Sequence, residues 1–202
     1  MKTAIRLLIM SLVYAALGFA SYARAQQTTQ VKTETATLAA GCFWGVEAYY
    51  KKIPGVLETQ VGYTGGHKDN PVYKDMSSGK TGHAEAIEIK FDPSIVTYET
   101  LLEHFYKFHD PTTPNRQGND VGIQYRSAVF YQNEKQKKIA EDFKQLVEKS
   151  KAWKAPIVTE VTQAKKFWPA EEYHQDYLVK NPKGYDNHYV RDISFGRVPA
   201  KK

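Results

Sequence analysis

The sequence predicts an α+β fold, a two-layer sandwich in which helices pack on a mixed, largely antiparallel sheet. Several short segments alternate apolar and polar residues, as half-buried strands do, and others carry apolar residues at helical spacing. The two kinds of segment do not repeat a regular βαβ unit. This irregular order favours an α+β sandwich over a doubly wound parallel sheet.

The predicted strands are bounded by turn residues and rich in aliphatic and aromatic side chains. They cover residues 35–40, 56–63, 84–91, 125–131 and 157–161. In the second, Leu57, Thr59, Val61 and Tyr63 share one face, and Gly65-Gly66 follows as a turn.

The predicted helices cover residues 45–52, 97–108, a segment that begins after Asn133, and 170–179. Pro54-Gly55 ends the first, and the side chains of Thr97 and Asn133 cap the next two. In the helix after Asn133, the apolar side chains share one face. Residues 110–122 read as a long irregular connection.

The N-terminus has the features of a secretory signal peptide. Lys2 and Arg6 precede an apolar stretch of 14 residues (7–20), and Ala23-Arg24-Ala25 forms an A-x-A cleavage site. An uncleaved membrane anchor is the alternative, but a spanning helix needs about 20 apolar residues. We therefore expect a signal peptide (1–25), a flexible lead-in (26–33) and a single catalytic domain (34–202), in a periplasmic or secreted protein without stable membrane insertion.

The charge of the chain does not indicate nucleic-acid binding. The formal charge of +6 includes Lys2, Arg6 and Arg24, so removal of residues 1–25 leaves +3. The remaining lysines stand in short pairs mixed with acidic residues, as on solvated helix faces, and no basic stripe is visible.

Cys42 is the only cysteine of the chain, and it stands where a predicted strand ends and a helix begins. In an exported protein, a solitary cysteine points to intermolecular pairing or to a free reactive thiol. The N–H groups and dipole of a helix N-terminus would lower the pKa of this thiol. The alternative is a buried, inert cysteine.

Glu85 opens the apolar face of the strand 84–91, ahead of Ile87, Ile89 and Phe91. Burial would raise the pKa of its carboxyl group, so that it could hold a proton at neutral pH. A protonated acid beside a thiolate suits a substrate that is attacked at one atom while a neighbouring oxygen leaves. The alternative is an ordinary carboxylate exposed at the edge of a strand.

The histidines do not indicate a metal site. His83, His104, His109 and His174 lack a metal-binding spacing such as H-E-x-x-H, so we expect no metal. The abundant tyrosines, taken one at a time, read as half-buried packing residues.

Five stretches together resemble the A-type peptide methionine sulfoxide reductases. They are GCFWGVE (41–47), GYTGG (62–66), the run from Tyr73 through GKTGHAEA (79–86), PTTPNRQGNDVGIQYRSAVFY (111–131) and FWPAEEYHQDY (167–177). They occur in the order of the family and span nearly all of the chain after residue 25.

The resemblance implies roles for individual residues. Cys42 would attack the sulfoxide sulfur, Glu85 would protonate the sulfoxide oxygen, and Tyr73 and Tyr125 would hydrogen-bond that oxygen. The implied substrate-binding residues are Phe43 and Trp44 as the apolar wall for the S-methyl group, Asp120 for the substrate backbone or the pocket, and His174, Tyr177 and Tyr185 as supporting groups. The resemblance also implies the S-sulfoxide of methionine, free or in oxidised proteins, as the substrate.

The sequence departs from many relatives in having no further cysteine near its C-terminus, where GRVPAKK has none. Reduction of the sulfoxide would leave Cys42 as a sulfenic acid. We therefore expect no bound cofactor, and an external thiol as reductant: a thioredoxin-like protein, or a small thiol such as dithiothreitol in vitro.

Two other functions compete with this interpretation. A cysteine hydrolase would pair Cys42 with His83 or His174 and form a thioester, and it would need an oxyanion hole. A non-catalytic periplasmic binding module would use the aromatic residues to hold a ligand and would not need the thiol.

Overall fold

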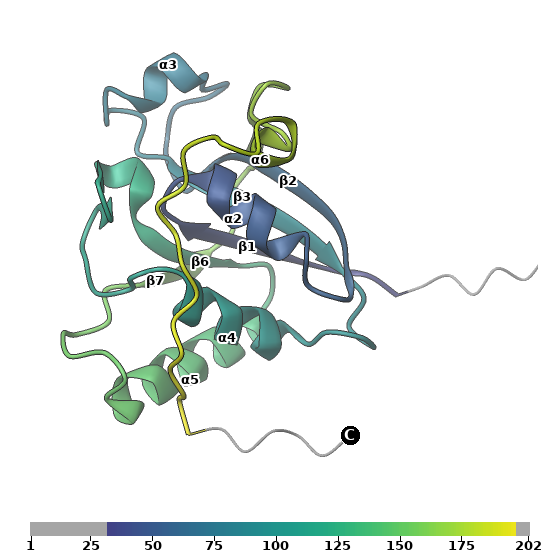
Figure 1. Cartoon of the computed structure of the whole chain (residues 1–202), viewed down its shortest axis with the longest axis vertical. Coiled ribbons are helices and arrows are strands. Elements are labelled where there is room, and N and C mark those ends of the chain that lie inside the picture. The colour runs from purple at the N-terminus through teal and green to yellow at the C-terminus, as the bar shows by residue number, and fades with distance from the viewer. Residues whose placement is uncertain (1–31, 197–202) are drawn as a thin grey trace, which may run out of the picture. The chain divides into compact units, whose positions relative to one another are not determined.

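The computed structural model describes residues 32–196 (Figure 1). The predicted signal peptide (1–25) and all but the last two residues of the predicted lead-in (26–33) lie outside the described residues. Residues 33–196 belong to one compact unit. Across residues 32–196, no helix combines the length and hydropathy that crossing a membrane requires.

A six-stranded sheet forms the centre of the fold, in the order β7-β6-β1-β3-β2-β8. Its strands are β1 (Glu34–Ala40), β2 (Val56–Thr64), β3 (Ala84–Phe91), β6 (Ser127–Tyr131), β7 (Glu160–Gln163) and β8 (Trp168–Pro169). All neighbours are antiparallel except β6 and β7. The chain makes that parallel pair through α5 (Glu134–Ser150), because parallel neighbours need a long crossover.

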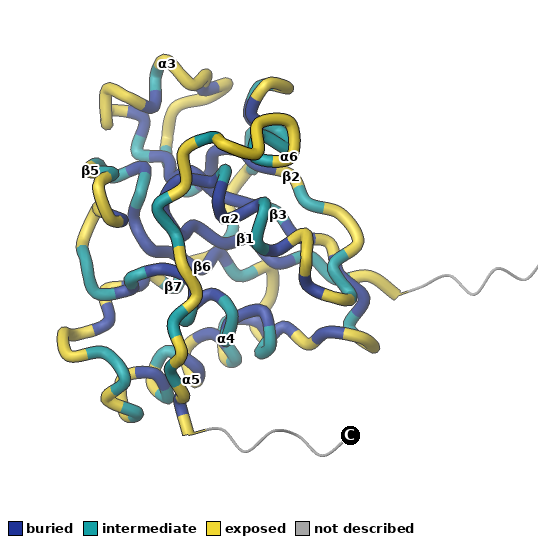
Figure 2. Tube along the Cα trace, viewed as in Figure 1, coloured by how far each residue is buried: buried dark blue, intermediate teal, exposed yellow. Residues whose placement is uncertain are grey.

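Three helices cover one face of this sheet: α2 (Phe43–Tyr50), α4 (Tyr98–Phe108) and α5. The core between the layers takes alternate residues from the strands, among them Leu38 and Ile87, and the apolar faces of the helices, among them Phe105 and Phe143. Figure 2 shows the central strands buried along most of their length. The predicted two-layer α+β sandwich with a mixed, largely antiparallel sheet is confirmed.

The shorter elements are α3 (Tyr73–Met76), the hairpin of β4 (Arg116–Gln117) and β5 (Asp120–Val121), the 3₁₀ turn η1 (Ile123–Tyr125) and α6 (Tyr177–Lys180). The sequence did not predict α3 or the hairpin. The predicted caps are confirmed, since Thr97 accepts a hydrogen bond from the Thr100 N–H and Asn133 from the Gln136 N–H.

Two predicted elements are wrong in extent. The strand expected over 157–161 is β7 at 160–163, because the Val158 N–H donates to the Pro111 carbonyl instead of joining the ladder. The helix expected over 170–179 shortens to α6. Asp176 has φ +57°, a left-handed conformation that breaks a helix, and the Gln175 side chain bonds the Val61 backbone.

Two predicted details of the strands also differ. Leu57 is 48% exposed rather than facing the core with Val61 and Tyr63, because a register shift interrupts the β2–β3 pairing between Val56 and Glu58. Tyr125 ends the η1 turn, and the strand it was expected to begin starts at Ser127.

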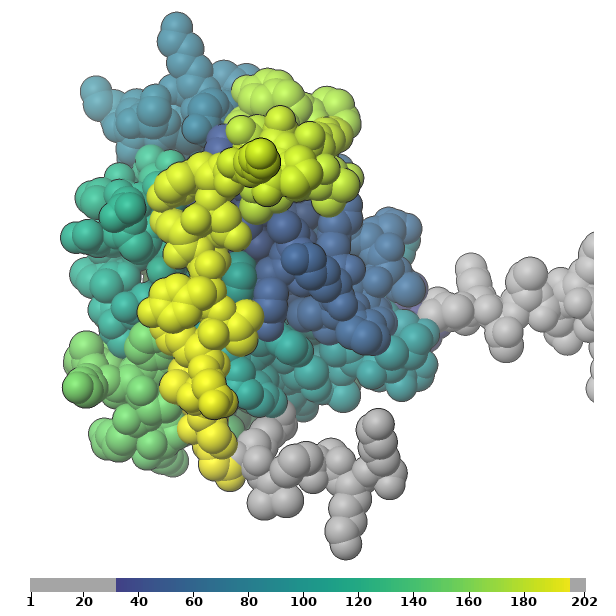
Figure 3. Space-filling view, viewed as in Figure 1, coloured from purple at the N-terminus to yellow at the C-terminus, as the bar shows by residue number. Residues whose placement is uncertain are grey.

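Residues 184–195 form an extended C-terminal segment, here named the strap, which runs over the helical face (Figure 3). His188 contacts the end of β1, the Arg191 N–H donates to the Lys107 carbonyl of α4, and Phe195 packs on Phe143 of α5. The strap thereby links the end of β1 to α4 and α5.

Candidate active site

The junction between β1 and α2 presents Cys42 at the N-terminus of a helix. Gly41 has φ +94°, a conformation that suits glycine, and it turns the chain from the strand into the helix. Cys42 is the N-cap residue of α2, and Phe43 and Trp44 are its first two helical residues. The prediction that Cys42 stands where a strand ends and a helix begins is confirmed.

Glu85 lies directly at this helix N-terminus. Its Oε2 accepts a hydrogen bond of 3.2 Å from the Phe43 N–H, and the residue is 2% exposed. Burial raises the pKa of Glu85 to about 8, against the Phe43 hydrogen bond, which lowers it. The predicted raised pKa is confirmed, and the alternative of an exposed carboxylate is wrong.

The pKa of the Cys42 thiol is raised, whereas the sequence-based expectation was a lowered pKa. Cys42 is 8% exposed, and burial, followed by the negative charge of Glu85, raises its pKa far above the ordinary value. The Trp44 N–H lowers that pKa, as expected of a helix N-terminus, but it is outweighed. The site therefore favours keeping at least one proton on the pair of Cys42 and Glu85.

A pocket of about 290 Å³ opens over Glu85, lined also by Tyr73, Asp120 and Tyr125. Burial raises the pKa of both phenols, and the charge of Glu85 is the next cause in each case, so both hydroxyl groups lie within electrostatic reach of the acid. Glu85, Tyr73, Tyr125 and Asp120 thus come together from β3, α3, η1 and β5, as the resemblance implied.

An aromatic cluster stands beside this pocket. The Trp44 ring stacks on Tyr177 with a centroid distance of 3.7 Å, and its Nε1–H donates to His174 Nδ1 at 3.0 Å. The His174 ring also lies 5.1 Å from Phe43 and 4.5 Å from Tyr73. Phe43 itself is only 1% exposed, so it supports the cluster from the core, whereas Trp44 is half-buried.

Asp120 and Tyr185 meet at the edge of the pocket. The Tyr185 hydroxyl donates to Asp120 Oδ1 at 3.1 Å, and Asn187 Nδ2 donates to Asp120 Oδ2 at 2.9 Å. All ten predicted site residues therefore lie in one connected region.

Glu171 belongs to this region but was not predicted. Its carboxylate accepts hydrogen bonds from the Tyr63 hydroxyl at 3.0 Å and from the Tyr73 N–H at 2.8 Å. Burial would raise its pKa, but these hydrogen bonds outweigh burial and lower it, so the group is ionised. Glu171 therefore fixes the start of α3, which carries Tyr73.

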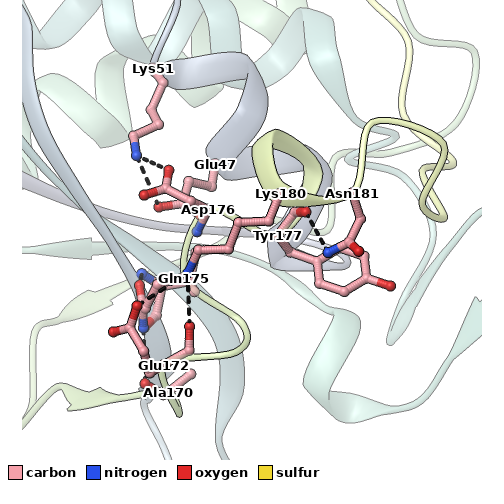
Figure 4. A network of polar contacts seen from close by, with 10 residues as sticks. Glu47, Lys51, Ala170, Glu172, Gln175, Asp176, Tyr177, Lys180 and Asn181 are labelled. Atoms are coloured by element: carbon pink, nitrogen blue, oxygen red, sulfur yellow. Dashed lines mark hydrogen bonds and ion pairs between the residues drawn. The ribbon is translucent and has the colours of Figure 1, made fainter.

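Glu47 was also missed, although its position contained a signal. It shares the buried face of α2 with Val46 and Tyr50, as Glu85 shares the apolar face of β3. Its carboxylate accepts from the Thr59 hydroxyl at 3.0 Å and from the Asp176 N–H at 2.7 Å, and Lys51 pairs with Asp176 (Figure 4). This network ties α2 to the turns that carry His174 and Tyr177.

The hydrogen bonds of His83 and His174, the two histidines considered for a cysteine hydrolase, go to groups other than Cys42. His83 Nδ1 accepts from the Gly66 N–H, and its Nε2 contacts the Lys68 carbonyl. His174 Nδ1 is occupied by the Trp44 indole. Among residues 32–196 no group of three or more His, Cys, Asp or Glu side chains could hold a metal ion.

Comparison with known proteins identifies the family. Residues 34–198 match the family described as Peptide methionine sulfoxide reductase. The chain belongs to this family. The predicted resemblance is confirmed, and the chain is a peptide-methionine (S)-S-oxide reductase, an oxidoreductase that acts on a sulfur group.

The reductase has similar relatives in bacteria. Peptide methionine sulfoxide reductase MsrA 1 of Mesorhizobium japonicum is 53% identical over 159 residues, which are 79% of this chain and 90% of that protein. Peptide methionine sulfoxide reductase MsrA of Pseudomonas fluorescens is 52% identical over 169 residues, 84% of this chain and 79% of that protein.

Solved structures share the fold of the reductase. Mxr1 from Saccharomyces cerevisiae in reduced form has a TM-score of 0.76 and 39% identity, and the match covers 81% of this chain and 94% of that chain. Methionine sulfoxide reductase A of Corynebacterium diphtheriae has a TM-score of 0.73 and 37% identity, and the match covers 82% of this chain and 83% of that chain. Mxr1 from Saccharomyces cerevisiae in complex with Trx2 has a TM-score of 0.54 and 25% identity, and the match covers 82% of this chain and 97% of that chain.

Proposed function

We propose that the reductase converts methionine-S-sulfoxide, free or in oxidised proteins, to methionine through Cys42 as nucleophile and Glu85 as proton donor. The observation that carries this proposal is the placement of both groups at the N-terminus of α2, where Glu85 accepts from the Phe43 N–H directly beside Cys42. With a pKa of about 8, Glu85 holds its proton at neutral pH.

The chemical step uses that proton. The sulfur of Cys42 attacks the sulfoxide sulfur as a thiolate, while a proton from Glu85 passes to the sulfoxide oxygen. The attack forms a bond between the two sulfur atoms. The protonated oxygen then passes, as a hydroxyl group, from the methionine sulfur to the Cys42 sulfur while the S–S bond breaks, so that methionine leaves and Cys42 becomes a sulfenic acid. The sulfoxide is reduced by two electrons and Cys42 is oxidised by two.

The surrounding residues orient the sulfoxide. Tyr73 and Tyr125 line the pocket with Glu85, and their hydroxyl groups donate hydrogen bonds to the sulfoxide oxygen in this proposal. The half-buried Trp44, backed by Phe43 and Tyr177, offers an aromatic face to the S-methyl group, which suits a soft sulfur and its methyl substituent. Asp120 holds the substrate backbone at the pocket edge, with His174 and Tyr185 in support.

The second half of the cycle requires a thiol from outside. The chain has a single cysteine, so the sulfenic acid has no internal thiol to condense with. We propose that a thioredoxin-like protein supplies it, in line with the yeast relative in complex with Trx2, and that dithiothreitol serves in vitro. No bound cofactor takes part.

The proposed setting is protein repair in the periplasm or outside the cell, based on the signal-peptide features of residues 1–25. Detection of the enzyme in the periplasmic fraction, with Gln26 as its N-terminal residue, would support this setting. An N-terminus at Met1 in the membrane fraction would instead indicate an anchor.

A reductase assay on separate epimers tests the function. A peptide containing methionine-S-sulfoxide should be reduced with dithiothreitol, while the R-sulfoxide should persist. Cys42→Ser should abolish turnover, because a hydroxyl lacks the nucleophilicity of a thiolate toward sulfur. Substantial S-sulfoxide reduction by pure Cys42→Ser protein would contradict the role of Cys42. A binding module would instead show no reduction by the unaltered protein, and its ligand binding would be the same in Cys42→Ser.

A further inference from the structure

His188 of the strap contacts the backbone that leads into the nucleophile. Its Nε2 lies 2.8 Å from the carbonyl oxygen of Ala40, two residues before Cys42. The side chain is 0% exposed and its ring stacks on Phe108, with a centroid distance of 4.6 Å and an interplanar angle of 4°. The imidazole is therefore a built part of the junction between β1 and α2.

The two glycines that flank Cys42 make room for this contact. A Cβ atom on Gly41 would lie 3.2 Å from His188 Nε2, and one on Gly45 would lie 2.5 Å from His188 Nδ1. The latter would also collide with Asp186 Oδ1. The backbone before and after Cys42 therefore lies too close to the strap to carry a side chain at Gly41 or Gly45.

Both ring nitrogens of His188 have a contact of hydrogen-bond length. Nδ1 lies 2.9 Å from Asp186 Oδ1, while Nε2 faces the Ala40 carbonyl. Burial would raise the pKa of Asp186, but the His188 side chain and backbone N–H outweigh burial and lower it, so Asp186 is a carboxylate. Asp186 Oδ1 and the Ala40 carbonyl oxygen are both hydrogen-bond acceptors, so each ring nitrogen of His188 faces an acceptor.

Asp186 acts on the thiol electrostatically. After burial, the Cys42 pKa is raised by the negative charges of Glu85, Asp120 and Asp186. His188 Nδ1 contacts the last of these groups, Asp186. The groups that face Cys42 are Glu85 from β3, Asp120 from β5, Asp186 from the strap and the phenols of Tyr73 and Tyr125. His188 is faced by Asp186 and, from the end of α4, by His109.

We propose that His188 is a positioning residue for the nucleophile: it fixes the Ala40 carbonyl ahead of Cys42 and holds the Asp186 carboxylate in place near the thiol. This inference rests on the proposed role of Cys42. No covalent step involves His188, and it does not touch the sulfoxide.

Three variants separate this role from general support of the strap. His188→Ala removes both hydrogen bonds, and loss of a charge-assisted contact should lower kcat by about tenfold or more. Asp186→Asn keeps an oxygen that accepts from the His188 N–H groups, so kcat should fall much less. Asp192→Asn, at an exposed position of the same strap, is the control and should behave as the unaltered enzyme.

The ionisation of the thiol gives the decisive readout. Because the chain has one cysteine, labelling cysteine with ¹³C at Cβ gives one NMR signal whose pH dependence reports Cys42. His188→Ala removes the hydrogen-bond partner of the Asp186 carboxylate, so its negative charge should act more strongly on the thiol and Cys42 should ionise at higher pH than in the unaltered enzyme. Asp186→Asn removes the carboxylate, so Cys42 should ionise at lower pH.

The outcomes distinguish this inference from the proposed function. Circular dichroism should first show that both variants are folded. The role of His188 would be overturned if the pH at which Cys42 ionises moved in the same direction in His188→Ala and in Asp186→Asn, or did not differ between them. A kcat for His188→Ala equal to that of the control would do so as well. Either result leaves the function of Cys42 standing, since that depends on Cys42→Ser losing activity. If His188→Ala does not fold, Asp186→Asn decides alone: Cys42 should ionise at lower pH than in the Asp192→Asn control, and an equal or higher pH would overturn the role of His188.

Discussion

Glu85→Gln is expected to stabilise the protein at high pH while it removes activity. Gln keeps the shape of Glu and an oxygen that can accept from the Phe43 N–H. It cannot release a proton to the substrate, so the rate should fall by about 10²–10⁴-fold. It also has no charge to bury.

The stability effect follows from the raised pKa of Glu85. Since its folded-state value is about 8 against 4.5 for an ordinary Glu, the folded protein binds more protons than the unfolded chain between these pH values. The wild-type free energy of unfolding should therefore fall as pH rises through this range. At 1.36 kcal/mol per pKa unit, the loss at Glu85 between pH 5 and pH 9 is about 4 kcal/mol.

Chemical denaturation of both proteins at pH 5 and pH 9 measures this effect. The stability of Glu85→Gln relative to wild type should increase by about 4 kcal/mol between the two pH values. Glu88→Gln, on the opposite and half-buried face of β3, is the matched control and should show a smaller change with normal activity. A difference between Glu85→Gln and wild type that does not vary with pH would refute the assignment of Glu85 as a buried, protonated acid.

Two further predictions concern the thiol and the helix that carries it. Substrate without reductant should add one oxygen to Cys42, and dimedone should trap the resulting sulfenic acid. A thiol added afterwards should form a mixed disulfide with Cys42. Mass spectrometry detects both species, and methionine formation without either of them would contradict the cycle. Gly45→Ala should lower the melting temperature although alanine favours a helix by about 1 kcal/mol, because the Cβ would collide with Asp186 and His188. A higher melting temperature would show that the strap yields easily.

The sequence predicted those parts of the molecule in which local pattern and burial coincide. Alternation placed Glu85 on the face that packs against the helices, and the same reasoning applied to α2 would have found Glu47. The prediction of a helix over 170–179 was wrong because hydrogen bonds between distant segments hold turns there. The Asp176 N–H donates to Glu47 and the Val61 N–H donates to Gln175, and periodicity carries no information about such bonds. His188 lies in a segment without periodicity, so only the assembled fold shows its contact.

The sign of the Cys42 shift shows a further limit of sequence reasoning. A helix N-terminus was expected to lower the pKa, and the Trp44 N–H does lower it. The larger causes, burial and the charge of Glu85, come from segments distant in the sequence. A local motif therefore predicted one contribution correctly and the net effect wrongly.

The burial of Cys42 also bears on the survival of the enzyme. Oxidants that convert methionine to its sulfoxide also attack exposed thiolates, and over-oxidation to sulfinic or sulfonic acid is not reversed by ordinary thiols. A thiol that is 8% exposed and has a raised pKa keeps its proton and is a poor target for peroxide. We expect the enzyme to tolerate the oxidative conditions that create its substrate, with its cysteine becoming reactive only when a sulfoxide occupies the pocket.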